Sequence, residues 1–136
     1  MGTVYETITL KNLRDVLNAQ CGYKEEDEIH QTQVKVIVDT GTSTLCITEE
    51  LRLQLGLDIM GERPVTVANG AVEMAKMANW VEIHWKDRST ACQPMVVPGC
   101  QEILLGCIPL ESMDLIVDPV RLELAGAHGD KIVYRA

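Results

Sequence analysis

Alternation of apolar and polar residues marks the strands of this chain. Apolar side chains at every second position line one face of a sheet, so such runs predict strands. In the run that ends at Asp39, the valines share one face, whereas Ile37 and Asp39 share the other. By this pattern and by short apolar runs, strands are expected over 3–10, 29–39, 45–47, 103–106, 115–117 and 122–124.

Two hairpins are predicted in the middle of the chain. Asn69-Gly70 stands between alternating runs over 65–74, and Asn-Gly in that setting is the strongest short hairpin signal. The second hairpin has strands over 80–85 and 90–97 with a turn over 86–89. Trp80 and Trp85 fall in this second hairpin and are expected to be packing residues.

Helices are expected at two places. Thr48 can cap a short helix over 49–55, and Pro109 suits the first turn of another that ends near residue 113. The stretch 11–22 has some helical spacing but also fits an extended connection, so it stays open. Residues 132–134 are either a late strand or a frayed end.

These elements define the expected fold class. The chain is all-β with two short helices, which suits a small closed β barrel. Its 136 residues are enough for one domain with a real core. No linker, repeat or low-complexity segment divides it, so we expect a single domain over 1–136.

A candidate for chemistry lies where an apolar strand runs into the turn Asp39-Thr40-Gly41. Two carboxylates that share one proton cannot both ionise, so one serves as general base and the other as general acid. Gly41 lets the backbone turn back under the carboxylate, where a Cβ would obstruct it. The Thr40 hydroxyl can both donate and accept, and Thr42 can donate to Asp39. The same triplet is also ordinary turn chemistry, so a plain turn residue is the alternative interpretation.

The triplet occurs once, and no other Asp is followed by Thr-Gly or Ser-Gly. If Asp39 catalyses hydrolysis, the second carboxylate must come from a second copy of the chain. We therefore expect a C2 homodimer whose axis passes through the catalytic centre. Asp118 also follows an apolar run, but Pro119 gives it a turn role, and we do not nominate it.

Charge and cysteine content limit the function classes. The formal net charge of −8 argues against a nucleic-acid-binding surface. The five cysteines match no disulfide framework or zinc spacing and are interpreted as free thiols, mostly small core residues, of a reducing cytosol. No signal peptide is expected, and no apolar run approaches the ~20 residues that span a bilayer. The expected location is cytoplasmic, away from membranes, and neither metal nor cofactor is expected.

Three motifs follow one another along the chain: the strand that ends at Asp39, the tip Ala68-Asn69-Gly70, and Leu104-Leu105-Gly106 before a short helix. This order resembles the single-domain retroviral-type aspartic peptidases, or retropepsins. It is most similar to their small prokaryotic members, the clan AA aspartic proteases, over about residues 1–124. The resemblance implies a closed acid-protease barrel and an aspartic endopeptidase that hydrolyses peptide or protein substrates.

The resemblance also implies roles by position. Asp39 matches the catalytic aspartate, within an active-site loop that includes Thr40, Gly41, Thr42 and Ser43. Thr40 matches the residue that ties the two loops across the dimer, and Gly41 matches the glycine that lines the cleft. The hairpin tip Ala68-Asn69-Gly70 matches the flap that closes over the substrate. The segment Leu104-Leu105-Gly106 matches the strand that crosses behind the catalytic loop in a ψ-shaped arrangement.

Some positions depart from the viral pattern. Viral enzymes have Arg where this chain has Cys107, many have an acid where it has Ser43, and their flaps hold more glycine than Gly70 alone. Two other function classes therefore stay open: a catalytically weak module that binds extended peptides as an added strand, and a dimeric scaffold. An Asp39→Asn variant separates them, because only a peptidase should lose turnover while staying folded.

Overall fold

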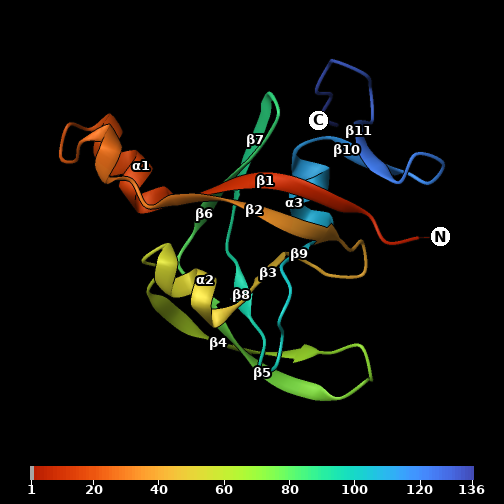
Figure 1. The fold of residues 1–136 in the computed structure, drawn as a ribbon, viewed down its shortest axis with the longest axis horizontal. Coiled ribbons are helices and arrows are strands. Elements are labelled where there is room, and N and C mark those ends of the chain that lie inside the picture. The colour runs from red at the N-terminus through yellow and green to blue at the C-terminus, as the bar shows by residue number, and fades with distance from the viewer. Residues whose placement is uncertain (1) are drawn as a thin grey trace.

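The computed structural model describes residues 2–136, which form eleven strands, and leaves only Met1 of the expected domain outside the described residues. Nine strands form one sheet and two form a separate hairpin (Figure 1). The strands of the large sheet are β1 Tyr5–Asn12, β2 Gln31–Val38, β3 Leu45–Ile47, β4 Ile59–Thr66, β5 Val72–Ala78, β6 Val81–Trp85, β7 Arg88–Cys92, β8 Met95–Val96 and β9 Leu104–Leu105. The small hairpin joins β10 Leu115–Asp118 to β11 Glu123–Gly126.

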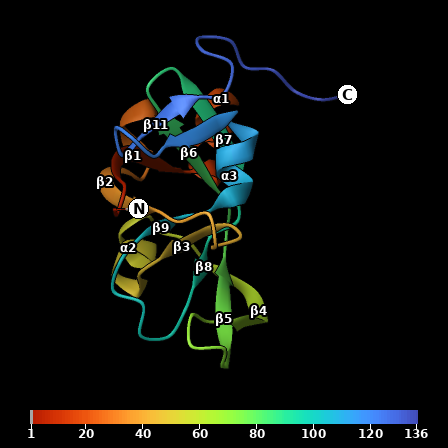
Figure 2. The same ribbon diagram turned by 90° about the vertical axis from the view of Figure 1, so that its right-hand side faces the viewer.

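The all-β class is confirmed, but the sheet is open where a closed barrel was expected. Its strand order is β4-β5-β8-β3-β9-β2-β1-β6-β7, and among residues 2–136 no ladder joins β4 to β7. The hairpins β4–β5 and β6–β7 lie at opposite ends of the molecule, which keeps these two edge strands apart (Figure 2). Nearly all of β4 is exposed, so this strand projects from the body instead of curling back to close it.

Residues 2–136 contain three α-helices instead of the expected two. Helices α2 Glu49–Gln54 and α3 Cys107–Ser112 confirm the predictions, and the Thr48 hydroxyl caps α2 by accepting from the Leu51 N–H at 3.1 Å. The undecided stretch contains α1 Leu13–Gln20. A short 3-10 helix, η1 Glu26–Glu28, lies after it in the chain.

The side chain of Asn12 explains why α1 starts where it does. Its Oδ1 accepts from the Asp15 N–H at 3.2 Å, and its Nδ2 donates to the carbonyl of Leu55 at 3.0 Å. Asn12 is only 7% exposed, so these bonds satisfy a buried amide. The second bond joins residues 43 apart, which local sequence patterns do not reveal.

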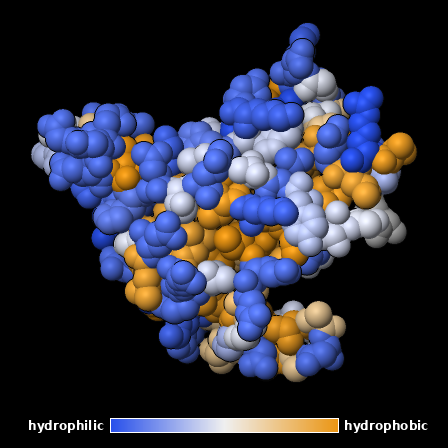
Figure 3. Space-filling model, viewed as in Figure 1, coloured by the Kyte–Doolittle hydropathy of each residue, from blue (hydrophilic) through white to orange (hydrophobic). Residues whose placement is uncertain are grey.

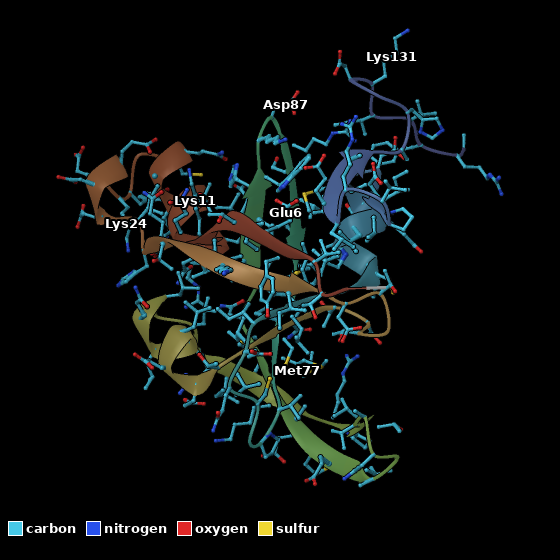
Figure 4. All side chains as sticks on the ribbon, turned by 45° about the vertical axis from the view of Figure 1, so that its right-hand side comes forward. Glu6, Lys11, Lys24, Met77, Asp87 and Lys131 are labelled. Atoms are coloured by element: carbon cyan, nitrogen blue, oxygen red, sulfur yellow. The ribbon has the colours of Figure 1, made fainter. Side chains whose placement is uncertain are left out.

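The hairpin β6–β7 turns more tightly than expected. Its turn is Lys86–Asp87, with Asp87 at the tip, and Arg88 already pairs with Trp85 in the ladder (Figure 4). Arg88 is 4% exposed and donates to the carbonyls of Met113 and Asp114, both at 2.8 Å. Arg88 was expected in the turn, and bonds to these distant acceptors instead accompany its place as a buried residue of β7.

The two tryptophans behave differently. Trp85 is buried, and its Nε1 donates to Glu6 Oε2 at 3.2 Å, as expected for a packing residue with a polar tip. Glu6 also accepts from the Leu124 N–H at 2.9 Å, so this labelled side chain ties β1 to β6 and β11 (Figure 4). Trp80, which was also expected to be a packing residue, is 46% exposed and lies outside the buried core.

The large core lies between the sheet and helices α2 and α3. Leu10, Ile47, Leu55, Ile83 and Leu105 are fully buried within it. Val36 is buried in this core as well, and Val34 and Val38 pack against it, so the prediction that the valines share one face of β2 is confirmed. None of the helices in residues 2–136 has the length and apolar character that a membrane crossing requires.

The exposure of the cysteines and the path of the C-terminal segment differ from what the sequence predicted. All five cysteines are free, but only Cys46 and Cys92 are buried, so the expectation that most lie in the core is wrong. Residues 132–134 form no strand. The segment beyond β11 is held near the end of α3, since the Val133 N–H donates to Asp114 Oδ2 at 3.0 Å and the Tyr134 hydroxyl donates to the Ser112 carbonyl at 2.7 Å, and only its last residues extend outward (Figure 2).

Candidate active site

Asp39 lies directly after β2, at a point where three strands meet. Its backbone N–H donates to the Leu105 carbonyl at 2.9 Å, so the residue begins its turn while still bonded to β9. One carboxylate oxygen accepts from the Gly41 N–H and the other from the Thr42 hydroxyl, each at 3.0 Å. The predicted hydrogen bond from Thr42 is therefore confirmed. Because both donors come from the same short loop, the carboxylate has a fixed orientation and remains partly exposed.

Strand β9 runs between the two strands that flank the loop. It pairs in parallel with β2 through Ile37 and Leu104, and antiparallel with β3 through Leu45 and Leu105. The start of α3 continues the support, since the N–H groups of Cys107 and Ile108 donate to the carbonyls of Thr42 and Ser43 at 2.8 and 2.9 Å. Leu104-Leu105-Gly106 and the start of α3 thus form a backbone cradle behind the Asp39 loop.

The two glycines of this region tolerate little extra volume. A Cβ on Gly106 would lie 2.2 Å from the Thr44 carbonyl oxygen and 2.3 Å from that of Thr42, closer than any side chain can approach. A Cβ on Gly41 would meet Asp39 Oδ1 at 3.2 Å, which is tight and agrees with the expected obstruction under the carboxylate. Gly106 therefore sets how closely the cradle approaches the loop.

Thr40 and Ser43 lie on the outside of the loop. Both are exposed, and within residues 2–136 neither side chain makes a hydrogen bond. Thr44 points the other way and donates to the Gln93 carbonyl at 3.0 Å, which anchors the end of the loop to the segment before β8. The loop thus presents free hydroxyls outward while its base is fixed to the sheet.

Ala68, Asn69 and Gly70 lie at the exposed tip of the β4–β5 hairpin. The tip is closed by a bond from the Val67 N–H to the Ala71 carbonyl at 2.9 Å, and Gly70 has a φ of +84° that favours glycine. In residues 2–136, no hydrogen bond of the tip reaches the Asp39 loop. The space-filling view shows the hairpin end as a lobe separated from the rest of the molecule by an open recess (Figure 3).

A hollow of about 380 Å³ lies on the same face of β2 as Asp39. Ile37 belongs to its lining, two residues before Asp39, and the two side chains share that face. Ile103, whose carbonyl accepts from the Ile37 N–H at 2.9 Å, adds a second apolar wall. The charged residues of the hollow come from three segments and are Lys35, Glu50 and Glu102. Apolar residues gather in the middle of this side of the molecule (Figure 3).

Comparison with known families decides where this arrangement belongs. Residues 26–112, which contain the Asp39 loop, the hairpin tip and the β9 cradle, match the family described as gag-polyprotein putative aspartyl protease. The chain belongs to this family. Membership confirms the retropepsin-type resemblance that the order of the motifs indicated.

Two solved structures are similar to this chain. It is similar to the retroviral protease-like domain of Ddi1 from Leishmania major, with a TM-score of 0.57 and 14% identity over 97% of this chain and 91% of that one. It is also similar to a retropepsin-like aspartic protease from Rickettsia conorii, with a TM-score of 0.47 and 19% identity over 87% of this chain and 89% of that one. The first likeness supports the fold. No curated protein sequence matches the chain.

Sequence reasoning missed the parts of this family site that depend on distant backbone. The N–H groups of Cys107 and Ile108 carry no side-chain signal, and the Thr44 anchor depends on where Gln93 lies. The hollow was also missed, although the alternation that put Ile37 on the face of Asp39 was a usable clue.

Proposed function

We propose that this protein is an aspartic endopeptidase that works as a homodimer and acts through one domain over 1–136. Water lies between Asp39 and its symmetry mate, and an extended peptide lies between the two Asp39 loops and the two β4–β5 hairpins. Family membership supports the activity class, and the geometry of Asp39 supports the role of that residue.

The observation that carries the proposal is the way Asp39 is held. Each of its oxygens receives one donor from its own loop, whereas a carboxylate offers about four acceptor positions. The remaining positions and the partly exposed face are free for a water and a second carboxylate. Because the cradle fixes the loop backbone, a C2 axis beside Thr40 would bring two such carboxylates together in a defined orientation.

The chemistry depends on one shared proton. The ionised Asp39 takes a proton from the water while the water oxygen attacks the peptide carbonyl carbon. The protonated Asp39 of the other copy donates its proton to the carbonyl oxygen. The tetrahedral diol collapses when the newly protonated Asp39 donates its proton to the amide nitrogen, the ionised Asp39 of the other copy takes a proton from a diol hydroxyl, and the C–N bond breaks, which restores one shared proton. The hairpin tips at Asn69-Gly70 close over the peptide and exclude water, which strengthens these interactions.

An Asp39→Asn variant tests the proposal directly. The purified chain is incubated with a diverse peptide library from about pH 4 to about pH 7, and cleavage products are identified by mass spectrometry. The variant should remain folded and lose cleavage at least ~1,000-fold, because an amide cannot serve as the general base.

Asp118→Asn is the matched control. Asp118 also ends a strand, and its Oδ1 accepts from the Val120 and Arg121 N–H groups at 2.9 and 3.1 Å, so it resembles Asp39 in local setting. This variant should keep full cleavage. Equal loss in both variants would contradict a catalytic role for Asp39. Binding of peptides without any cleavage would point to the binding module, and neither activity would point to the scaffold.

A further inference from the structure

Two cysteines lie in sulfur–sulfur contact beside the candidate active site. The Cys46 thiol donates to the Cys100 sulfur at 3.4 Å, although the two residues are 54 apart in sequence. Cys46 lies in β3, immediately after the Asp39 loop, and is paired to Leu104 on one side and Met95 on the other. Cys100 comes directly after a turn whose Gly99 has a φ of +77°.

We propose that Cys46 and Cys100 form a reversible intramolecular disulfide, a redox modification site that links β3 to the segment before β9. Among residues 2–136 this is the one sulfur–sulfur contact between cysteines. Thiol–disulfide exchange requires one thiol that the oxidant can reach. Cys100 is partly exposed and meets this need, whereas Cys46 is only 2% exposed and can react afterwards from inside the protein.

A small disulfide of the glutathione type is the oxidant in this reaction. The Cys100 thiolate attacks one sulfur of the oxidant, forming a mixed disulfide and releasing one thiolate. Cys46 then attacks the Cys100 sulfur, its proton passes to the second departing thiolate, and the internal S–S bond forms. Two protein thiols are oxidised to a disulfide while one small disulfide is reduced to two thiols.

The order of the two steps is set by the surroundings of each sulfur. Burial, together with the hydrogen bond to Cys100, raises the pKa of the Cys46 thiol to about 12. Cys46 therefore stays protonated until Cys100 has reacted. Burial likewise raises the pKa of Cys92 to about 11, and within residues 2–136 no other cysteine sulfur contacts it, so Cys92 stays reduced.

Bond formation requires a local movement. A disulfide is about 2.0 Å long, so sulfurs at 3.4 Å must approach each other by more than 1 Å. Cys46 is fixed between two ladder partners, whereas Cys100 lies in a connecting segment bonded locally from its N–H to the Val97 carbonyl. The segment 98–102 therefore moves, whereas Ile103 stays bonded to the Ile37 N–H, and Gln101 and Glu102 of this segment line the hollow on the Asp39 face of β2.

The test uses the full chain in mixtures of reduced and oxidised glutathione, quenched by alkylation and mapped by mass spectrometry. The wild type should lose two hydrogens in mass and yield a crosslinked peptide that contains Cys46 and Cys100. Cys46→Ser should stop at a glutathione adduct on Cys100, and Cys100→Ser should leave Cys46 reduced. Because Cys46 is buried and its replacement can affect folding, Cys100→Ser is the decisive variant.

Cys21→Ser is the matched control, since it removes an exposed thiol that contacts no other cysteine sulfur in the described part of the chain, residues 2–136. It should form the internal disulfide as the wild type does. Three results would overturn the inference: a stable glutathione adduct on wild-type Cys100, crosslinking between chains through Cys21 ahead of the internal bond, or no oxidation at all.

A second readout rests on the proposed function. Oxidised wild type should show a peptide KM changed by at least ~3-fold with kcat nearly unchanged, because the hollow moves while the Asp39 loop keeps its cradle. If the protein is not a protease, only this KM measurement is lost. The disulfide itself is measured without activity, so the two failures are distinguishable.

Discussion

At the scale of single residues, two side chains show how a carboxylate can be held in different ways. Asp39 is partly exposed and takes both donors from its own loop. Asp15 is 5% exposed and takes its donors from Lys24 and His30, which lie 9 and 15 residues away. Local sequence suffices for the first arrangement, and tertiary packing is needed for the second.

Removing the Thr42 hydroxyl should change how the proposed enzyme responds to acid. A donor to a carboxylate favours its charged form. With Thr42→Ala that donor is lost, so the acidic limb of the pH–rate profile should move to higher pH. Thr42→Ser keeps a hydroxyl and serves as control. An acidic limb that stays in place in Thr42→Ala would contradict the role of the 3.0 Å bond to Asp39.

Asp15 should contribute to stability in a pH-dependent way. Burial tends to raise the pKa of Asp15, but bonds from Lys24 Nζ at 2.8 Å and from the His30 N–H and ring lower it from 3.8 to about 2. A lowered folded pKa means that the stabilisation is complete above the unfolded value, near 4, and is lost as pH falls through about 2.

Urea unfolding at about pH 5 and at about pH 2 measures this contribution. The wild type should lose about 2 kcal/mol of unfolding free energy between these values that Asp15→Asn does not lose. The same pH dependence in both proteins would assign the acid sensitivity to other groups.

At the scale of elements, the junction of β9 and α3 positions the Asp39 loop. Gly106 caps α3 and allows two loop carbonyls to approach its Cα, and the next two N–H groups bond to that loop. This junction is built almost entirely from backbone. It therefore depends on one small residue, Gly106, whose Cα lies against the loop backbone.

Gly106→Ala should destabilise the protein severely. Its Cβ would lie 2.2 and 2.3 Å from backbone oxygens, which cannot rotate away as a flexible side chain can. We expect a loss of more than ~3 kcal/mol in unfolding free energy, at the upper end for overpacked sites. Gly61→Ala is the matched control, because nothing lies within 4 Å of its Cβ position, and it should change stability by less than ~1 kcal/mol. Similar melting temperatures for the two variants would show that the loop is held in another way.

At the scale of the whole molecule, one chain presents one Asp-Thr-Gly loop, with the hydroxyls of Thr40 and Ser43 directed outward. A water-activating pair of carboxylates therefore needs two copies. The net charge of −8 makes association of copies sensitive to salt, since screening reduces the repulsion between them.

Mixing subunits should reveal a shared site. When wild type and Asp39→Asn chains are combined at fixed total concentration and allowed to exchange, activity should fall as the square of the wild-type fraction. Light scattering on the same samples should report dimers throughout. A linear fall in activity would mean that each chain acts alone, and a monomer at every concentration would contradict the dimer.

Local chemistry determined much of this protein from sequence alone. Alternation placed Ile37 and Asp39 on one face of β2, Thr48 marked the start of α2, and Asn69-Gly70 marked the hairpin tip. The order of the motifs indicated the family. These signals can be read because each depends on residues close together in the chain, where backbone geometry and side-chain periodicity act directly.

Only the tertiary structure decided the rest. Arg88 was expected in a turn and is buried because its acceptors lie 25 residues and more away. The Asn12 side chain that caps α1 also bonds to the distant Leu55 carbonyl, and the sheet stays open because β4 and β7 lie at opposite ends. The contact of Cys46 with Cys100 is equally distant in sequence. Such features depend on contacts between residues that are far apart in the sequence. The pattern of apolar and polar residues along the chain does not show which distant residues come into contact.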